Sequence, residues 1–214
     1  MQHDVLIFTL AAHMASFGEL AGTTRGTERT PSFSSLVGLL GAALGIQRGD
    51  DLLVAISQEY APAVKVVKDG GVLEDFHTVE TPNFKKTRPF RTRSEELDGK
   101  TGTVLTRRIY RQDVEYQVAI FSLVSQPEID VHQCLSALER PRYTLYAGRR
   151  NCPLSKPPAP KVLTASTVSE VLGTENIVYD SRLDGGDCQA HHEIERMDLL
   201  TGNRQFGIRR ELIV

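Results

Sequence analysis

The stretch DVLIFTLAA, residues 4–12, is a near-continuous apolar run that follows a single aspartate. An apolar run of this length, without alternating polar residues, predicts a strand buried on both faces and therefore central in a sheet. No basic region precedes it, so a secretory signal peptide is not expected. The chain also holds no run of 18 apolar residues, which predicts no transmembrane helix and no contact with a membrane.

A first helix is expected in SSLVGLLGAALGIQRGDD, residues 34–51, where leucines recur at helical spacing. Ser34 or Ser35 would cap its N-terminus, and Gly49 with the following aspartate would end it. Three glycines inside the pattern would each cost helix stability, so we expect them to permit close packing of the helix on the sheet. They are Gly38, Gly41 and Gly45.

Further elements follow along the chain. AVKVVKDGGVLEDF, residues 63–76, predicts a hairpin that turns at DGG. TVLTRRIYRQDVEYQVAIFSLV, residues 103–124, predicts more strand structure with RQD as a turn, and QPEIDVHQCLSALERP, residues 126–141, predicts a helix with Pro127 in its first turn. The order strand, helix, two strands, helix, strand is the split βαββαβ pattern, so we predict an α+β, ferredoxin-like (RRM-like) core.

Basic residues are concentrated in two segments of a chain whose formal net charge is −2. Residues 85–111 hold nine Lys or Arg against three acidic residues, and residues 140–150 hold four arginines and no acidic residue. In the second segment Tyr143 and Tyr146 are interleaved with the arginines, and that mixture favours an anionic partner with flat groups, such as single-stranded nucleic acid. For residues 85–93 alone a solvated charged loop is the simpler interpretation. A module that contacts acidic protein surfaces is a further alternative.

The motifs of common enzyme classes are absent from the sequence: GxSxG, HExxH, the P-loop and GxGxxG. RNA cleavage without a metal needs only a general base and a general acid, and His13, His77, Tyr110 or Tyr146 could supply them, although no spacing favours this. The three cysteines are widely spaced and lack a CxxC pair, so we expect reduced thiols in a cytoplasmic protein, with no metal and no cofactor.

Two long strings carry a specific likeness to known proteins: TPSFSSLVGLLGAALGIQRGDD, residues 30–51, and RPRYTLYAGRRNCPLSKP, residues 140–157. Together with FHTV, residues 76–79, they closely resemble the Cas-five family subunit of type I-E CRISPR Cascade complexes. The likeness covers most of residues 4–157 and is thin over the C-terminal tail. The chain departs from the family at Ala12-His13, where a Gly-Pro pair is common, and this keeps a nuclease role for His13 open.

The resemblance implies an RNA-binding domain over residues 1–157, with a hairpin "thumb" inserted at about 78–112, and a short β-rich extension over residues 158–214. It implies a non-catalytic subunit that binds and caps the 5′ handle of crRNA. Such a subunit contacts the backbone subunit CasC and the large subunit CasA, and meets target DNA only through the crRNA duplex. A metal-independent endoribonuclease that processes pre-crRNA is the alternative.

The residues expected to contact RNA are serine, aromatic and arginine positions near the end of the first strand, at the start of the first helix, on the thumb and in residues 142–150. We expect the thumb arginines to meet phosphates and the others to grip the handle. These residues are Ser16, Phe17, Arg25, Ser32, Ser34, Arg107, Arg108, Arg111, Arg142, Tyr143, Tyr146, Arg149 and Arg150.

Overall fold

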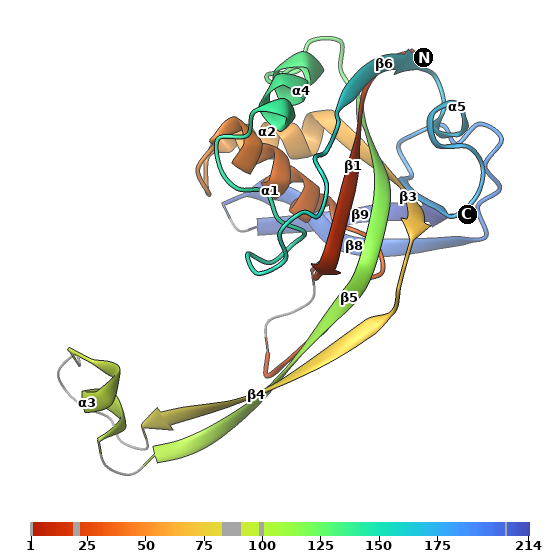
Figure 1. Ribbon diagram of the computed structural model, residues 1–214. Helices are drawn as coiled ribbons and strands as arrows, with labels where there is room; N and C mark the ends of the chain where they lie inside the picture. Colours follow the sequence, from red (N-terminus) through yellow and green to blue (C-terminus); the bar gives the residue numbers. More distant parts are fainter. Residues whose placement is uncertain (1, 19–21, 83–90, 99–100, 204) are drawn as a thin grey trace.

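The strands form one mostly antiparallel sheet, and helices cover it, so the α+β class is confirmed (Figure 1). The computed structural model describes residues 2–18, 22–82, 91–98, 101–203 and 205–214. The helices are α1 (Phe33–Leu44), α2 (Asp51–Glu59), α3 (Arg93–Leu97), α4 (Val131–Glu139) and α5 (Val168–Leu172). The strands are β1 (His3–Ala15), β2 (Thr24–Arg25), β3 (Tyr60–Lys68), β4 (Val72–Pro82), β5 (Thr101–Ser122), β6 (Lys161–Ala165), β7 (Ile177–Asp180), β8 (His192–Gly202) and β9 (Gln205–Ile213).

The predicted first strand is β1, and it lies inside the sheet between β6 and β5. The strand order is β6-β1-β5-β3-β7-β9-β8, while β2 and β4 pair with β5 off this path. β1 runs antiparallel to β5 from Val5, opposite Phe121, to Ala15, opposite Arg111. The long apolar run therefore forms a central strand, as its composition predicts.

The predicted hairpin at DGG is wrong, because β3 and β4 both pair with β5 rather than with each other. Gly70 N–H donates to the carbonyl of Gln112, and Gln112 N–H donates to the carbonyl of Gly71, at 3.0 Å each. The DGG segment is thus held along β5 and does not fold back. The predicted turn at RQD is also wrong. β5 runs through it as one strand of 22 residues, and Asp113, with φ of 44°, takes up the irregularity.

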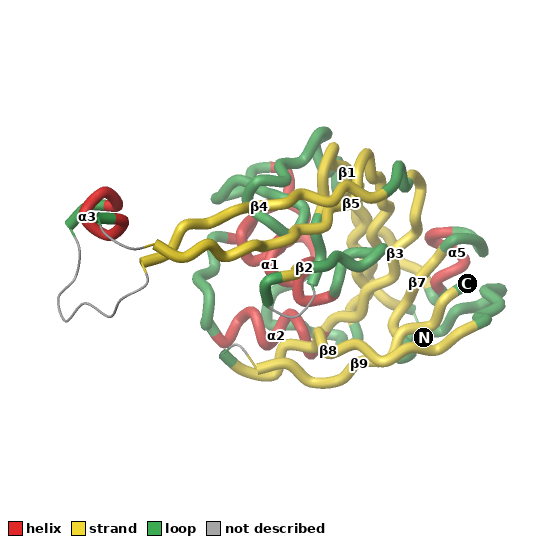
Figure 2. Tube along the Cα trace, turned by 90° about the horizontal axis from the view of Figure 1, so that it is seen from below, coloured by secondary structure: helices red, strands yellow, loops and turns green. Residues whose placement is uncertain are grey.

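A long β-hairpin projects from the body of the molecule (Figures 1 and 2). Its arms are residues 72–82 of β4 and 101–111 of β5, and we call this pair of arms the projecting hairpin. β4 has no buried residue, and the first buried residue of β5 is Tyr110. The hairpin is therefore held by its own ladder rather than by the core. Residues 83–90, which hold much of the first basic segment, lie outside the described residues.

The first helix is shorter than expected and is capped by a different serine. Ser32, not Ser34 or Ser35, is the N-cap of α1, and its Oγ accepts a hydrogen bond from the Ser35 N–H at 3.3 Å. Gly45, with φ of 82°, ends the helix. The predicted stop at Gly49-Asp50 instead begins a second helix, since the Asp50 carboxylate accepts from the Leu52 N–H and caps α2.

The glycines of α1 do not pack on the sheet, contrary to the prediction. A Cβ on Gly41 would lie 2.5 Å from Cδ2 of Leu53, so this glycine permits the close approach of α2. A Cβ on Gly38 would meet nothing within 4 Å. The close contact that the glycines permit is therefore between two helices, one of which the sequence patterns did not reveal.

The predicted helix of residues 126–141 is α4, but it begins at Val131. Asp130 and Gln133 form a capping box, so Pro127 lies before the helix and not in its first turn. Val131, Cys134 and Leu138 are buried and Leu135 is half-buried, so these four residues form the inner face of α4.

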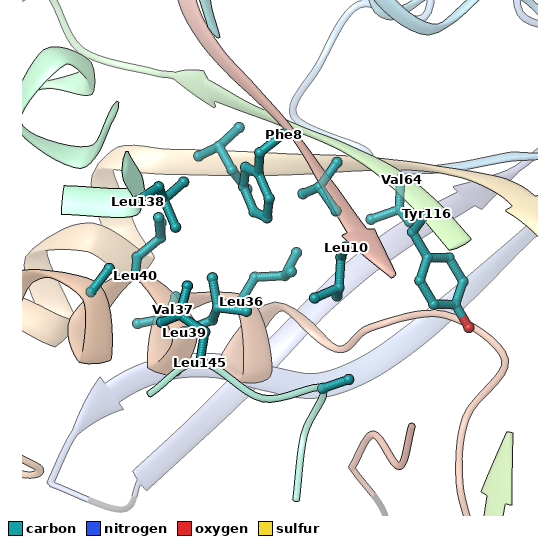
Figure 3. Close-up of a cluster of buried hydrophobic side chains, with 14 of the residues drawn as sticks. Phe8, Leu10, Leu36, Val37, Leu39, Leu40, Val64, Tyr116, Leu138 and Leu145 are labelled. Carbon is teal, nitrogen blue, oxygen red and sulfur yellow. The ribbon is translucent and has the colours of Figure 1, made fainter. Parts of the chain in front are cut away.

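Helices α1, α2 and α4 lie on the same face of the sheet, where α1 and α4 enclose the main hydrophobic core with it (Figures 1 and 3). Phe8 of β1, Leu36 of α1 and Tyr116 of β5 belong to this cluster. On the other face a smaller cluster includes Phe121 and Val168 and is covered by α5. In the described part of the chain no helix combines the length and hydropathy that a membrane crossing requires.

The C-terminal strands continue the same sheet through β7, and they are tied to α1 by a buried ion cluster around Arg209. Arg209 Nε and Nη2 donate to the carboxylate of Asp198 at 3.0 and 2.9 Å, and Nη2 also donates to Glu211. Asp198 in turn accepts from the Phe33 N–H at 2.7 Å. Burial lowers the pKa of the Arg209 guanidinium, but the hydrogen bond with Asp198 and the charges of Glu211 and Asp198 raise it overall.

Candidate nucleic-acid interface

Arg107 and Arg108 are neighbours in the sequence, but they extend from opposite faces of the projecting hairpin, because side chains alternate along a strand. Arg108 is the register partner of Arg25, which β2 holds parallel to β5. Partners across two strands place their side chains on the same face, so these two arginines stand side by side. The backbone also fixes this pairing, since the Arg107 N–H donates to the Thr23 carbonyl at 2.8 Å.

Tyr110 lies two residues beyond Arg108 on the same face and receives a third arginine. The guanidinium carbon of Arg149 is 5.1 Å from the centre of the Tyr110 ring, a cation–π distance. Asn151 Nδ2 donates to the Tyr110 hydroxyl at 3.1 Å. Burial raises the pKa of Tyr110, but hydrogen bonds from Asn151 and Arg149, with the positive charge of Arg149, lower it overall.

Arg25, Arg108 and Arg149 thus gather beside Tyr110, and we call these three residues the arginine row. Within the described residues, no carboxylate oxygen lies within 4.0 Å of their side-chain nitrogens. Asp75, the cross-strand partner of Arg108, hydrogen bonds with His77 instead. The row is a partly enclosed group of positive charges that internal ion pairs do not neutralise.

Arg107 and Arg111, on the other face of the hairpin, are paired with acids. Arg107 Nε lies 3.4 Å from a carboxylate oxygen of Glu74, and its guanidinium lies over the ring of Phe76. Arg111 Nη2 lies 3.3 Å from a carboxylate oxygen of Asp69. The structure therefore does not bring the three predicted hairpin arginines together. Arg108 joins the row, and the other two have partners of their own.

The turn after β1 packs against residues 142–150. Ser16 N–H donates to the Ala147 carbonyl at 3.1 Å, and a Cβ on Gly148 would overlap the Ser16 carbonyl oxygen. Phe17, at 1% exposure, belongs to the core and meets the Tyr116 ring edge-on, with ring centres 5.9 Å apart. The ring of Phe17 is therefore unavailable for stacking on a base, contrary to the expected contact.

The N-terminus of α1 is already occupied by groups of the protein itself. Ser32 is buried and caps the helix, and the Asp198 carboxylate accepts from the Phe33 N–H. A carboxylate at this position satisfies the helix dipole and leaves no anion site, so Ser32 is a structural residue. Ser34 is half-buried and hydrogen bonds with Ser32 through its hydroxyl.

The other predicted residues of 142–150 lie outside the arginine row, and Arg142, Tyr143 and Tyr146 lie beside α1. Arg142 lies at the C-terminal end of α1, where its N–H donates to the Ala43 carbonyl at 2.9 Å and its side chain packs beside Gly45. Tyr143, Tyr146 and Arg150 are exposed. Of the three arginines in RYTLYAGRR, only Arg149 belongs to the arginine row.

Two residues of this arrangement were not predicted as RNA-binding residues. Tyr110 was considered as a general acid or base and as an aromatic residue among the basic residues of TRRIYRQD, but it was not one of the residues expected to contact RNA, and Asn151 did not appear at all. They meet across 41 positions of the chain. Their role depends on a tertiary contact, and the local composition holds no signal for it.

The candidate histidines are not brought together either. His13 Nδ1 lies 3.2 Å from Asp113 Oδ1, and the side chain is 86% exposed. Since Ala12 faces the main core, alternation along β1 places His13 on the opposite face of the sheet. His77 pairs with Asp75 on the projecting hairpin.

Known proteins resemble this chain in sequence and in fold. The family described as CRISPR-associated protein Cas5 matches residues 5–210. The Escherichia coli (strain K12) protein named CRISPR system Cascade subunit CasD is 37% identical over 163 residues, which cover 71% of this chain and 68% of that protein.

Solved structures also resemble this chain. One chain of a CRISPR RNA-guided surveillance complex matches with a TM-score of 0.68 and 26% identity, over 98% of this chain and 89% of that chain. A second structure, described as a Cas protein, matches with a TM-score of 0.61 and 21% identity, over 98% of this chain and 94% of that chain, and shares the fold. The match over residues 5–210 and the identity to CasD together show that the chain belongs to the Cas5 family of CRISPR-associated proteins.

Proposed function

We propose that this chain is a Cascade subunit that binds and caps the 5′ handle of a crRNA. In this role it joins the backbone subunit CasC to the large subunit CasA in the cytoplasm and meets target DNA only through the crRNA duplex. The observation that carries the proposal is the arginine row, whose charges lack carboxylate partners among the described residues. The similar Escherichia coli protein is named as a Cascade subunit, which supports the complex.

We also infer a ferredoxin-like core made of β6, β1, β5 and β3, with the projecting hairpin as its thumb. Along the chain these are the fourth, first, third and second strands of the core, and each pairs antiparallel with its neighbour. Two helices follow the first core strand and one follows the third. This arrangement is the one expected of a split βαββαβ chain.

The proposed mechanism of binding is electrostatic. Arg25, Arg108 and Arg149 hold phosphates of the handle where the RNA passes the base of the projecting hairpin. The ring of Tyr110 supports the Arg149 guanidinium and keeps its donors directed at the RNA. A charge held in place in this way loses little conformational entropy when RNA binds.

The sharpest test compares two adjacent arginines. Arg108→Ala removes a charge from the row, so the affinity for handle RNA should fall by about tenfold, a typical cost for one charge-assisted contact. The slope of log affinity against log salt concentration should also become shallower by about one released counterion. Filter binding or fluorescence anisotropy with a labelled handle RNA at several salt concentrations measures both quantities.

Arg107→Ala is the matched control, since it removes the same charge from the other face of the same strand. It should change the affinity by less than about threefold, because Arg107 is paired with Glu74. Equal losses in the two variants would show that the hairpin binds RNA without regard to face, and the arginine row would then not be the site.

A metal-independent endoribonuclease is the second candidate, and the His13–Asp113 pair favours it. A carboxylate beside Nδ1 leaves Nε2 of an exposed histidine free for proton transfer. RNA held on the arginine row would, however, lie across the sheet from His13. We expect labelled repeat RNA to stay intact with the protein in EDTA. Specific cleavage that His13→Ala abolishes would establish the nuclease instead.

A further inference from the structure

The outer face of α1 forms the floor of an open groove that the arginine row does not use. The groove has a volume of about 800 Å³. One wall is the segment 143–148, and the other is formed by the start of α2 and the tip of the β8–β9 hairpin. Ser34, Gly38 and Ala42 lie along the floor at intervals of four residues, and therefore on one side of the helix.

The groove is suited to apolar side chains. Its partly exposed lining residues include Ile46, Val54 and Leu200, and no Cβ stands over the middle of its floor, because a Cβ on Gly38 would meet nothing within 4 Å. Exposed aromatic rings lie around it: Tyr143 at 50%, Tyr146 at 38% and Phe206 at 45% exposure. Exposed aromatic residues around an apolar depression are typical of protein–protein interfaces.

Among the described residues, the charge of the groove is confined to one end. Among the described lining residues the charged side chains are Arg48 and Asp50, which follow the C-terminus of α1. Arg142 lies beside the same end, packed on Gly45. No carboxylate oxygen of a described residue lies within 4.0 Å of the charged nitrogens of Arg48 or Arg142. A polyanion would need cations along the whole groove, whereas one carboxylate on an apolar segment would match this pattern.

We propose that this groove is a docking site for an amphipathic helix of a partner protein. Small residues four apart on α1 leave a shallow track into which the side-chain ridge of a second helix can pack. The apolar side chains of the partner helix lie over Gly38, between Tyr146 and Phe206, and a carboxylate near one end of that helix meets Arg48 and Arg142. The docking rests on the proposed function only in that the partner is another protein subunit of the same complex.

Gly38→Leu tests the proposal, because a Cβ at this exposed position meets nothing within 4 Å, and the longer side chain would occupy the floor of the groove without touching the arginine row. Leucine also favours a helix more than glycine does, so the thermal midpoint should not fall. When the variant is co-expressed with the other subunits of its complex and a guide RNA, the yield of at least one protein subunit in affinity purification should fall by about tenfold or more, as expected when a central contact is blocked. Binding of labelled handle RNA by the isolated variant should stay within about twofold.

Two further variants make the result decisive. Ser136→Leu places the same side chain at an exposed position on α4, outside the groove, and should leave assembly unchanged. Arg48→Glu reverses the charge at the end of the groove and should weaken capture of the same subunit that Gly38→Leu loses. Normal assembly of Gly38→Leu would overturn the docking proposal while leaving the RNA site untouched. Loss of RNA binding in Gly38→Leu, with assembly preserved, would identify the groove as an RNA site and also overturn it.

Discussion

At the scale of single residues, burial and pairing decide what each predicted contact can do. Arg107 and Arg108 have the same chemistry and adjacent positions, yet one is paired with Glu74 and the other stands beside Arg25. Both residues are arginine, so only the register of β5 against β2 and β4 gives them different partners. A basic segment therefore predicts that an anion is bound, but not by which of its arginines.

The close packing of residues 142–150 is most sensitive to mutation at Gly148. It has φ of 84°, and a Cβ there would overlap the Ser16 carbonyl oxygen. Gly148→Ala should therefore destabilise the protein by more than about 2 kcal/mol and displace Arg149 from Tyr110. Urea unfolding measures the first effect, and the affinity for handle RNA measures the second.

Gly38→Ala is the control for this prediction. Its Cβ would meet nothing within 4 Å in a regular helix, so this variant should be as stable as the natural protein, or more stable by up to about 1 kcal/mol. If Gly148→Ala matched it in stability and in RNA affinity, the contact between Gly148 and Ser16 would not hold the arginine row in place.

At the scale of elements, the length of β5 organises the molecule. One strand of 22 residues pairs with β1 and β3 inside the body and with β4 beyond it. Because β3 and β4 share this partner, the chain between them does not need to turn, and the DGG segment becomes an irregularity in a ladder. The projecting hairpin is then an extension of the central sheet, which fixes its direction relative to the core.

Shortening the projecting hairpin tests its proposed role as a thumb. In a variant that lacks residues 79–104 and joins Thr78 to Leu105 through Asn-Gly, the core should be intact, because no described residue of the removed segment is buried. The free energy of unfolding should change by less than about 1 kcal/mol, the usual range for surface changes. The variant should still bind handle RNA with an affinity close to that of the full-length protein, since the arginine row remains, while co-purification with CasC should be lost.

Two results would contradict the proposed role of the projecting hairpin as a thumb that contacts CasC. Normal recovery of CasC with the shortened protein would show that the hairpin does not contact the backbone subunit. A large loss of affinity for handle RNA would place the RNA site on the removed residues instead of the arginine row.

At the scale of the whole molecule, the buried ion cluster joins the C-terminal strands to the first helix. Arg209 contacts Asp198 on β8 and Glu211 on β9, and its guanidinium lies 5.6 Å from the centre of the Phe33 ring. Arg196 extends the cluster to Glu28 at 2.7 Å. Segments separated by more than 150 positions are thereby locked together, which holds the floor and the far wall of the proposed groove at a set distance.

Arg209→Ala should reduce the free energy of unfolding by about 3–5 kcal/mol at pH 7.5, because it leaves buried carboxylates without their partner. Urea unfolding of the variant and of the natural protein at pH 7.5 measures the loss.

Arg210→Ala is the matched control, since Arg210 is exposed and pairs only loosely with Glu193 and Glu195. It should cost less than about 1 kcal/mol. A deficit for Arg209→Ala as small as that for Arg210→Ala would show that the buried ion cluster does not hold the C-terminal strands to the first helix.

The sequence by itself determined the central strand at residues 4–12, the presence of helices α1 and α4, and the family, because local hydrophobic patterns and long specific strings carry that information. It also located the basic segments. Only the tertiary structure decided that β3 and β4 share β5, that Ser32 and Asp198 close the N-terminus of α1, and that Arg149 rests on Tyr110. Each of these depends on which distant residues meet, and a charge or a ring acquires its role from the partner that the fold places beside it.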